Sequence, residues 1–116
     1  MACNSFNFNG CFAIPIGFDF NDFYFEDDNK DYTGFDFSMS IQAPNAAVDL
    51  LTLSVVFDDS TTGIYLPNPA NGVIFIQIMK ADTLSLGDYN YSIRVTDPSN
   101  IEKPFSYGTI SFIEVN

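Results

Sequence analysis

The chain has 116 residues, a formal net charge of −11 and no histidine. A chain of this length forms one domain with one core, and its 13 Phe supply enough apolar area to offset the entropy lost on folding. With four basic residues against fifteen acidic ones, nucleic acid and anionic membranes are excluded as expected partners. Without histidine, Ser-His and Cys-His nucleophiles are excluded, so we expect no enzyme activity, no catalytic or metal-binding residues and no cofactor.

The first segment, residues 1–16, carries regularly spaced apolar side chains around an Asn9-Gly10 turn signal. Two interpretations stay open: an extra hairpin that completes a sheet of its own chain, or an arm that adds a strand to a neighbouring subunit. In the hairpin register Cys3 and Cys11 lie too far apart to bridge, so free thiols are expected, with a disulfide or a shared metal as the alternative. The residues expected to contact a neighbouring subunit are Phe6, Phe8, Phe12 and Ile14.

Residues 17–116 are predicted to form a single β domain, because period-two alternation of apolar and polar residues recurs along them. The alternation is clearest over 35–42 and 89–96, where the odd positions are apolar. It recurs over 51–57, again with the odd positions predicted to face the core, and a last strand is expected over 105–115.

Two segments depart from simple alternation. Phe residues fall on even positions up to Phe20 and on odd positions from Phe23, so a bulge or turn is expected near Asn21-Asp22. Residues 73–79 are apolar on both faces, which is typical of a strand covered on both sides. That strand is either central, or its outer face meets a partner.

Turn residues separate the strands at 26–31, 43–45, 58–63, 67–72 and 97–100, and one short helical turn is expected from Lys80 to Leu86. A Gly that leads into a Tyr at the start of a strand, as at Gly87 and Tyr89, is typical of the tyrosine corner of immunoglobulin-like domains. The predicted fold class is therefore all-β, an antiparallel two-sheet immunoglobulin-like sandwich of about seven strands.

The order of motifs adds a resemblance. An acidic turn enters a Thr-Gly-aromatic step and an alternating strand (31–39), an Asn-Gly turn enters an isoleucine-rich strand and a short helix (71–84), and a Gly-x-Tyr-x-Tyr segment precedes an Asp-Pro turn and a Gly-containing strand (87–110). In this order the motifs resemble the immunoglobulin-like module of phage baseplate upper proteins and of related short tail or head-fibre proteins. The residues interpreted as fold-specifying are Gly34, Phe35, Phe37, Gly87, Tyr89 and Tyr91.

The resemblance implies a bacteriophage structural protein, made in the host cytoplasm and located in the virion. It would bind other virion proteins in the tail, baseplate or neck, as a homo-oligomer or in symmetric copies. No apolar run reaches the ~20 residues that cross a bilayer, which agrees with a soluble chain. A capsid decoration or head-fibre protein is the alternative within this class.

An alternative of another class is a carbohydrate- or calcium-dependent binding domain. The aromatic residues would stack on sugars, but alternation assigns Phe57 and most of the other rings to the core. The acidic turn over 26–31 begins like a calcium loop, yet it lacks the Gly and the later Glu of an EF-hand. Core packing and a solvated turn are therefore the favoured interpretations.

Overall fold

The computed structural model describes residues 11–27, 29–45 and 48–114 of the chain. Over these residues the chain is all-β, as predicted, with eight strands and two single 3-10 turns. The first 3-10 turn is η1 (Pro69–Asn71), and the second, η2 (Lys80–Asp82), is a shorter form of the helical turn expected there. The strands are β1 (Cys11–Pro15), β2 (Phe20–Glu26), β3 (Asp36–Gln42), β4 (Asp49–Val56), β5 (Gly63–Tyr65), β6 (Val73–Ile78), β7 (Gly87–Thr96) and β8 (Glu102–Ile113).

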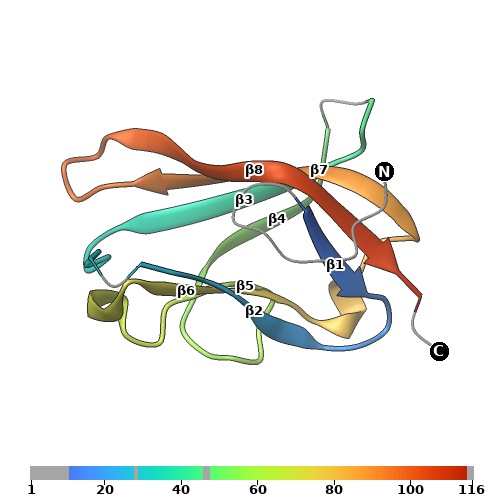
Figure 1. Cartoon of the computed structure of the whole chain (residues 1–116), viewed down its shortest axis with the longest axis horizontal. Coiled ribbons are helices and arrows are strands. Elements are labelled where there is room, and N and C mark those ends of the chain that lie inside the picture. The colour runs from blue at the N-terminus through green and yellow to red at the C-terminus, as the bar shows by residue number, and fades with distance from the viewer. Residues whose placement is uncertain (1–10, 28, 46–47, 115–116) are drawn as a thin grey trace.

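The strands follow one another through hydrogen bonds in the order β1-β8-β7-β3-β4-β5-β6-β2. Figure 1 shows that this sheet folds over, so that β3, β4, β7 and β8 face β2, β5 and β6 across the core. Strand β4 joins the two layers, because it pairs with β3 as far as Ser54 and with β5 at Val55 and Val56. The result is a nearly closed barrel, with β1 and β2 at the two ends of the strand order.

Two strand pairs differ from the predicted antiparallel arrangement. Strand β1 runs parallel to β8, with Ile14 opposite Phe112, and β4 runs parallel to β5. Strand β1 therefore belongs to the same sheet as the strands of residues 17–116. The β1–β8 pair joins segments far apart in sequence, and local alternation does not show which strands pair or in which direction.

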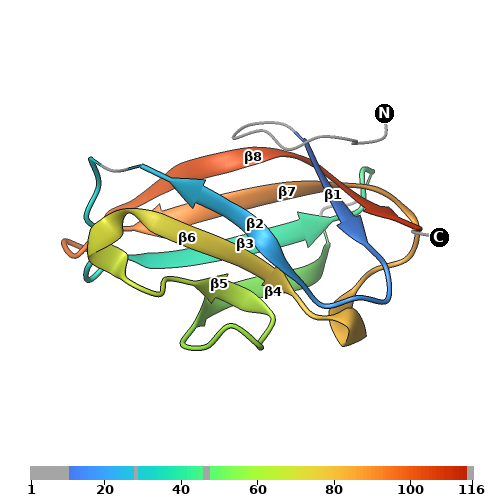
Figure 2. The same ribbon diagram turned by 60° about the horizontal axis from the view of Figure 1, so that its bottom comes forward.

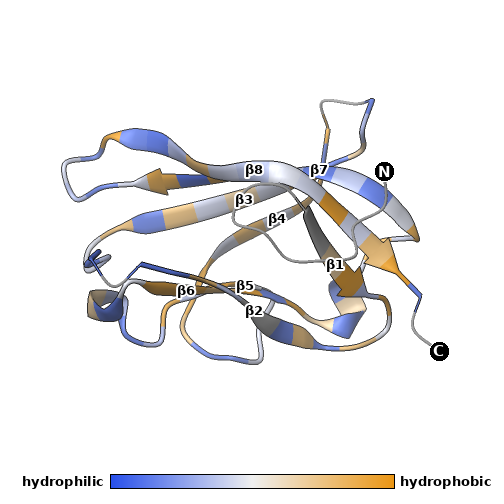
Figure 3. Cartoon of the chain, viewed as in Figure 1, coloured by the Kyte–Doolittle hydropathy of each residue, from blue (hydrophilic) through white to orange (hydrophobic). Residues whose placement is uncertain are grey.

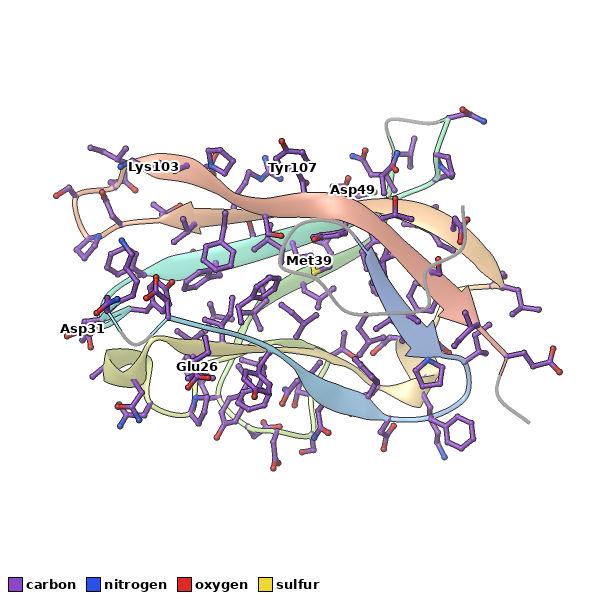
Figure 4. The ribbon with its side chains drawn as sticks, viewed as in Figure 1. Glu26, Asp31, Met39, Asp49, Lys103 and Tyr107 are labelled. Carbon is purple, nitrogen blue, oxygen red and sulfur yellow. The ribbon has the colours of Figure 1, made fainter. Side chains whose placement is uncertain are left out.

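The core lies between the two layers and contains the inward side chains of β3, β6, β7 and β8. Ile74, Ile76 and Ile78 of β6 are fully buried, and Met39 of β3 faces them from the opposite layer (Figure 4). Hydrophobic residues follow β6 along its length in Figure 3, and the strand lies between β2 and β5. The inward odd positions predicted for 35–42 are confirmed at Phe37, Met39 and Ile41.

The predicted change of register in β2 is confirmed. Phe20 pairs with Ile78 and Phe23 with Ile76, so the pairing shifts between Phe20 and Phe23, at the expected bulge. The inward assignment of Phe57 is wrong, since 90% of this residue is exposed. Strand β4 ends at Val56, and the chain then turns out of the barrel.

Glycines fix two of the turns. Gly34 has a φ of +82°, which favours glycine, and a Cβ there would lie 3.3 Å from the Pro98 ring. A side chain at position 34 would therefore be strained. Gly72, at φ +72°, packs under the acidic turn, where a Cβ would lie 1.9 Å from the carbonyl oxygen of Asp27.

Candidate functional site

Four rings pack together inside the barrel near the β2–β3 connection and form what we call the inner aromatic cluster: Phe25, Tyr32, Phe37 and Phe105. Their neighbouring rings meet edge to face, at interplanar angles of 75–89°. Phe35 lies at the rim of this cluster, and the centroid of its ring is 5.6 Å from that of Tyr32. Burial, followed by the negative charge of Asp27, raises the pKa of Tyr32. The fold-specifying residues Phe35 and Phe37 therefore lie in or against the core.

The two tyrosines interpreted as fold-specifying lie on β7. The Tyr89 hydroxyl donates a hydrogen bond to the backbone carbonyl of Ser85 at 2.8 Å, and its ring packs edge to face on Phe112. Tyr91 is buried, and its hydroxyl shares a 2.9 Å hydrogen bond with Ser106 of β8. Gly87 begins the strand that carries both tyrosines. Each tyrosine thus ties β7 to a neighbouring segment.

Of the residues expected to contact a neighbouring subunit, the side chain of Ile14 is the one that the structure describes. Ile14 is 0% exposed in the core of its own chain, which leaves none of its surface for a partner, contrary to expectation. Phe12 lies in β1, whose backbone pairs with β8 at Ile110. Phe6 and Phe8 lie outside the described residues, as do Cys3 and the Asn9-Gly10 turn. The described part of the segment therefore completes a sheet of its own chain.

The carboxylates of the acidic turns hold their own loops. Hydrogen bonds from the Thr33 hydroxyl and backbone N–H lower the pKa of Asp31. The pKa of Asp58 is lowered by the Ser60 N–H and by two hydroxyls. No group of three or more residues able to hold a metal ion occurs in the described ranges. In both loops the carboxylate accepts hydrogen bonds from residues two or three positions later in the chain, as is usual for Asp in turns.

A row of aromatic rings lies instead on the outer face of β2, β6 and β5, the layer that Figure 2 brings forward. Tyr24 pairs across the strands with Phe75, and Phe75 with Tyr65. The ring centroids are 5.3 Å apart in the first pair and 6.4 Å in the second. We call these three residues the aromatic stripe. Tyr24 is half exposed, and Phe75 and Tyr65 are partly buried, so the rings present part of their faces to solvent.

A hollow of about 340 Å³ lies beside two rings of the stripe, those of Tyr65 and Phe75. Tyr65, Phe75 and Pro67 form its apolar part, and Asn21, Asp59 and Gln77 its polar part.

Two amide side chains fix the loop that borders this hollow. The Gln77 side-chain nitrogen donates to the carbonyls of Asp58 and Thr61, and that of Asn21 donates to the carbonyl of Asp59. These bonds hold the 58–62 loop against β6 and β2. The polar wall of the hollow is therefore tied to the sheet by hydrogen bonds.

The outer face of the opposite layer has a different character. Hydroxyl side chains lie side by side there on three strands, at Ser40 of β3, Thr52 of β4 and Ser92 of β7. Arg94 lies on this face and reaches the Ser40 hydroxyl at 3.4 Å. Tyr107 projects from β8 on the same side, 68% exposed, away from the stripe (Figure 4). Of these two faces, the β2–β6–β5 face is the one with contiguous aromatic rings.

Sequence reasoning did not name the stripe. The signal for it was present in residues 73–79, whose apolar outer face suggested either a central strand or a partner contact. Phe75 lies on that outer face. Tyr24 and Tyr65 lie beside Phe75 because of the register in which β2, β6 and β5 pair, and β2 contains a bulge. The sequence does not show this register.

No protein-family model matches the sequence, and no curated protein matches it at a significant level. The helical turns in the described residues fall short of the length and apolarity of a membrane-spanning helix.

Proposed function

We propose that the chain is an immunoglobulin-like assembly module of a bacteriophage particle, which binds neighbouring virion proteins and catalyses no reaction. The strand layout supports the immunoglobulin-like part of this proposal. One layer has the order β1-β8-β7-β3-β4, and β5, β6 and β2 cover its inner face. The bond from the Tyr89 hydroxyl to Ser85 is the contact that defines a tyrosine corner, and Tyr91 follows two residues later.

The aromatic stripe is the observation that carries the binding role. Tyr and Phe are enriched in the buried centres of protein interfaces, because a rigid ring covers a large area at a low entropy cost. Here three rings lie on paired strands of a sheet, so their positions are fixed before any partner arrives. The acidic turn residues Asp31 and Asp58 are already bonded within their own loops. The geometry favours binding over catalysis.

The position within the particle follows from the resemblance noted in the sequence. We propose the tail, baseplate or neck, with capsid decoration or a head fibre as the alternative position. A module of this size would act in several symmetric copies, each with the stripe against a neighbouring virion protein. The chain would be made in the host cytoplasm and then incorporated into virions.

Mass spectrometry of particles tests this proposal. Particles are purified on a density gradient from the source that encodes the chain, and peptides of the chain are quantified against those of the major capsid protein. We expect the chain to band with the particles at a fixed ratio that matches a symmetric position. Its absence from intact particles, with the chain present in the soluble fraction, would contradict the proposal.

A further inference from the structure

We propose that the hollow beside the aromatic stripe binds the guanidinium group of an arginine side chain, presented by a basic segment of the partner protein. This inference rests on the proposed function of the stripe as a partner-binding surface. It names the chemistry that the partner must bring to that surface.

The shape and lining of the hollow fit a planar cation. Tyr65 and Phe75 line it with centroids 6.4 Å apart and ring planes tilted by 39°. Such partly open ring faces attract a cation through the ring quadrupole, and arginine also stacks on them through its own plane. Asp59 lines the polar side of the same hollow. A carboxylate at this place could accept two parallel hydrogen bonds from a guanidinium group.

The Asp59 carboxylate differs from that of its neighbour. The Asp58 carboxylate accepts bonds from Ser60 and Thr61 at 2.8–3.0 Å. Asp59 accepts the Asn21 amide through its backbone carbonyl, and no described residue donates to its side chain. The 58–62 loop is therefore held in place without the Asp59 carboxylate, which is left to meet a ligand.

Charge selects a cation over a neutral or anionic ligand. The whole chain carries −11, and neither Lys nor Arg lines the hollow. A second carboxylate, Glu26, lies on β2 two residues beyond Tyr24 and therefore on the same outer face. A negative field around rings of fixed position attracts basic segments and repels acidic ones.

Two matched peptides test the proposal: acetyl-Gly-Arg-Gly-amide and the same peptide with citrulline, which keeps the planar side chain but is neutral. Each is titrated into the isotope-labelled full chain, and the ring signals of the stripe and the Asp59 amide are followed by NMR. We expect the arginine peptide to shift these signals saturably. The citrulline peptide should bind at least about five-fold more weakly, since the cation–π attraction is lost.

Variants locate the binding. Asp59→Asn, in an exposed loop, and Phe75→Leu, in the stripe, should each weaken arginine-peptide binding by about five-fold or more. Glu102→Gln removes one charge elsewhere, and Tyr107→Leu removes an exposed ring from the other layer, so both should leave the affinity within about two-fold. The amide spectrum of each variant reports whether it is folded. If Phe75→Leu does not fold, Asp59→Asn decides.

The proposal would be overturned by equal binding of the arginine and citrulline peptides, by no shift up to about 20 mM peptide, or by full affinity in Asp59→Asn. A titration with cellobiose separates a sugar platform from a cation site, and cellobiose shifts on the stripe without arginine shifts would also overturn it. Failure of this inference is distinguishable from failure of the proposed function. If Asp59→Asn enters particles normally while loss of the stripe rings prevents entry, the stripe binds its partner without an arginine.

Discussion

The inner aromatic cluster and the aromatic stripe consist of the same residue types but differ in ring geometry and in burial. In the cluster the rings meet edge to face at 75–89° and are largely buried, whereas in the stripe the two pairs are tilted by 41° and 39° and partly open. Tyr24 and Phe25 are adjacent in sequence, yet they belong to different groups because successive strand residues face opposite sides. The face of the strand on which a ring lies therefore decides whether it packs in the core or lies on the surface for which we propose a binding role.

The largest effect is expected when the cluster is broken. Phe37→Ala removes a ring that is 1% exposed and contacts both Tyr32 and Phe105. The free energy of unfolding should fall by about 3–5 kcal/mol, because a cavity replaces the ring. Urea unfolding followed by circular dichroism measures the loss. A decrease below about 1 kcal/mol would show that the cluster is not the main stabilising group.

The second largest loss of stability is expected at Gly72, which packs under the acidic turn. In Gly72→Ala the new methyl group meets the Asp27 carbonyl, so we expect a loss well above the ~1–2 kcal/mol of the left-handed conformation alone. Gly17→Ala is the matched control, since its φ is +82° but no atom lies within 4 Å of the added Cβ. Equal melting temperatures for the two variants would mean that the turn moves without cost.

A smaller loss of stability is expected when the hydrogen bond between Tyr89 of β7 and the preceding turn is removed. Tyr89→Phe keeps the ring against Phe112 but removes the donor to Ser85, and should lower the unfolding free energy by about 1 kcal/mol. Tyr107→Phe, at an exposed position, should change it by less than about 0.5 kcal/mol. Indistinguishable urea midpoints for these two variants would argue against a stabilising corner.

The carboxylate of Asp58 should make the stability of the folded chain depend on pH in acid. Hydrogen bonds from Ser60 and Thr61 hold the pKa of folded Asp58 below its ordinary value of 3.8. The ionised group therefore stabilises the folded chain above that value, and this contribution is lost as the pH falls through the folded-state pKa. Asp58→Asn should thus unfold with a shallower dependence on pH below about 4. Parallel acid-unfolding curves for variant and wild type would contradict this role.

Much of the fold could be predicted because alternation is a local property. The buried odd positions of β3 and the bulge in β2 both follow from it. The parallel β1–β8 pair could not be found in this way, since it joins residues about a hundred positions apart in the chain. Ile14 was consequently assigned to a partner rather than to the core. Phe57 was misplaced because alternation does not show that β4 ends at Val56.

The candidate site was less accessible to sequence reasoning. Phe75 could be suspected from the two-sided apolar pattern of β6, but its neighbours depend on how three strands pair. Asp59 adjoins Asp58 in an unremarkable acidic turn, and only the hydrogen bonds of the loop distinguish the two carboxylates. A surface assembled across strands has no contiguous sequence motif.

Removal of the outer rings most directly tests the division of roles between cluster and stripe. Tyr24→Ser/Tyr65→Ser is produced together with wild-type chain during particle assembly, and the ratio of the two in purified particles is measured by mass spectrometry. We predict that the double variant melts within a few degrees of wild type, as its rings are partly exposed, yet is strongly depleted from particles. Incorporation at the input ratio by a folded double variant would contradict the account.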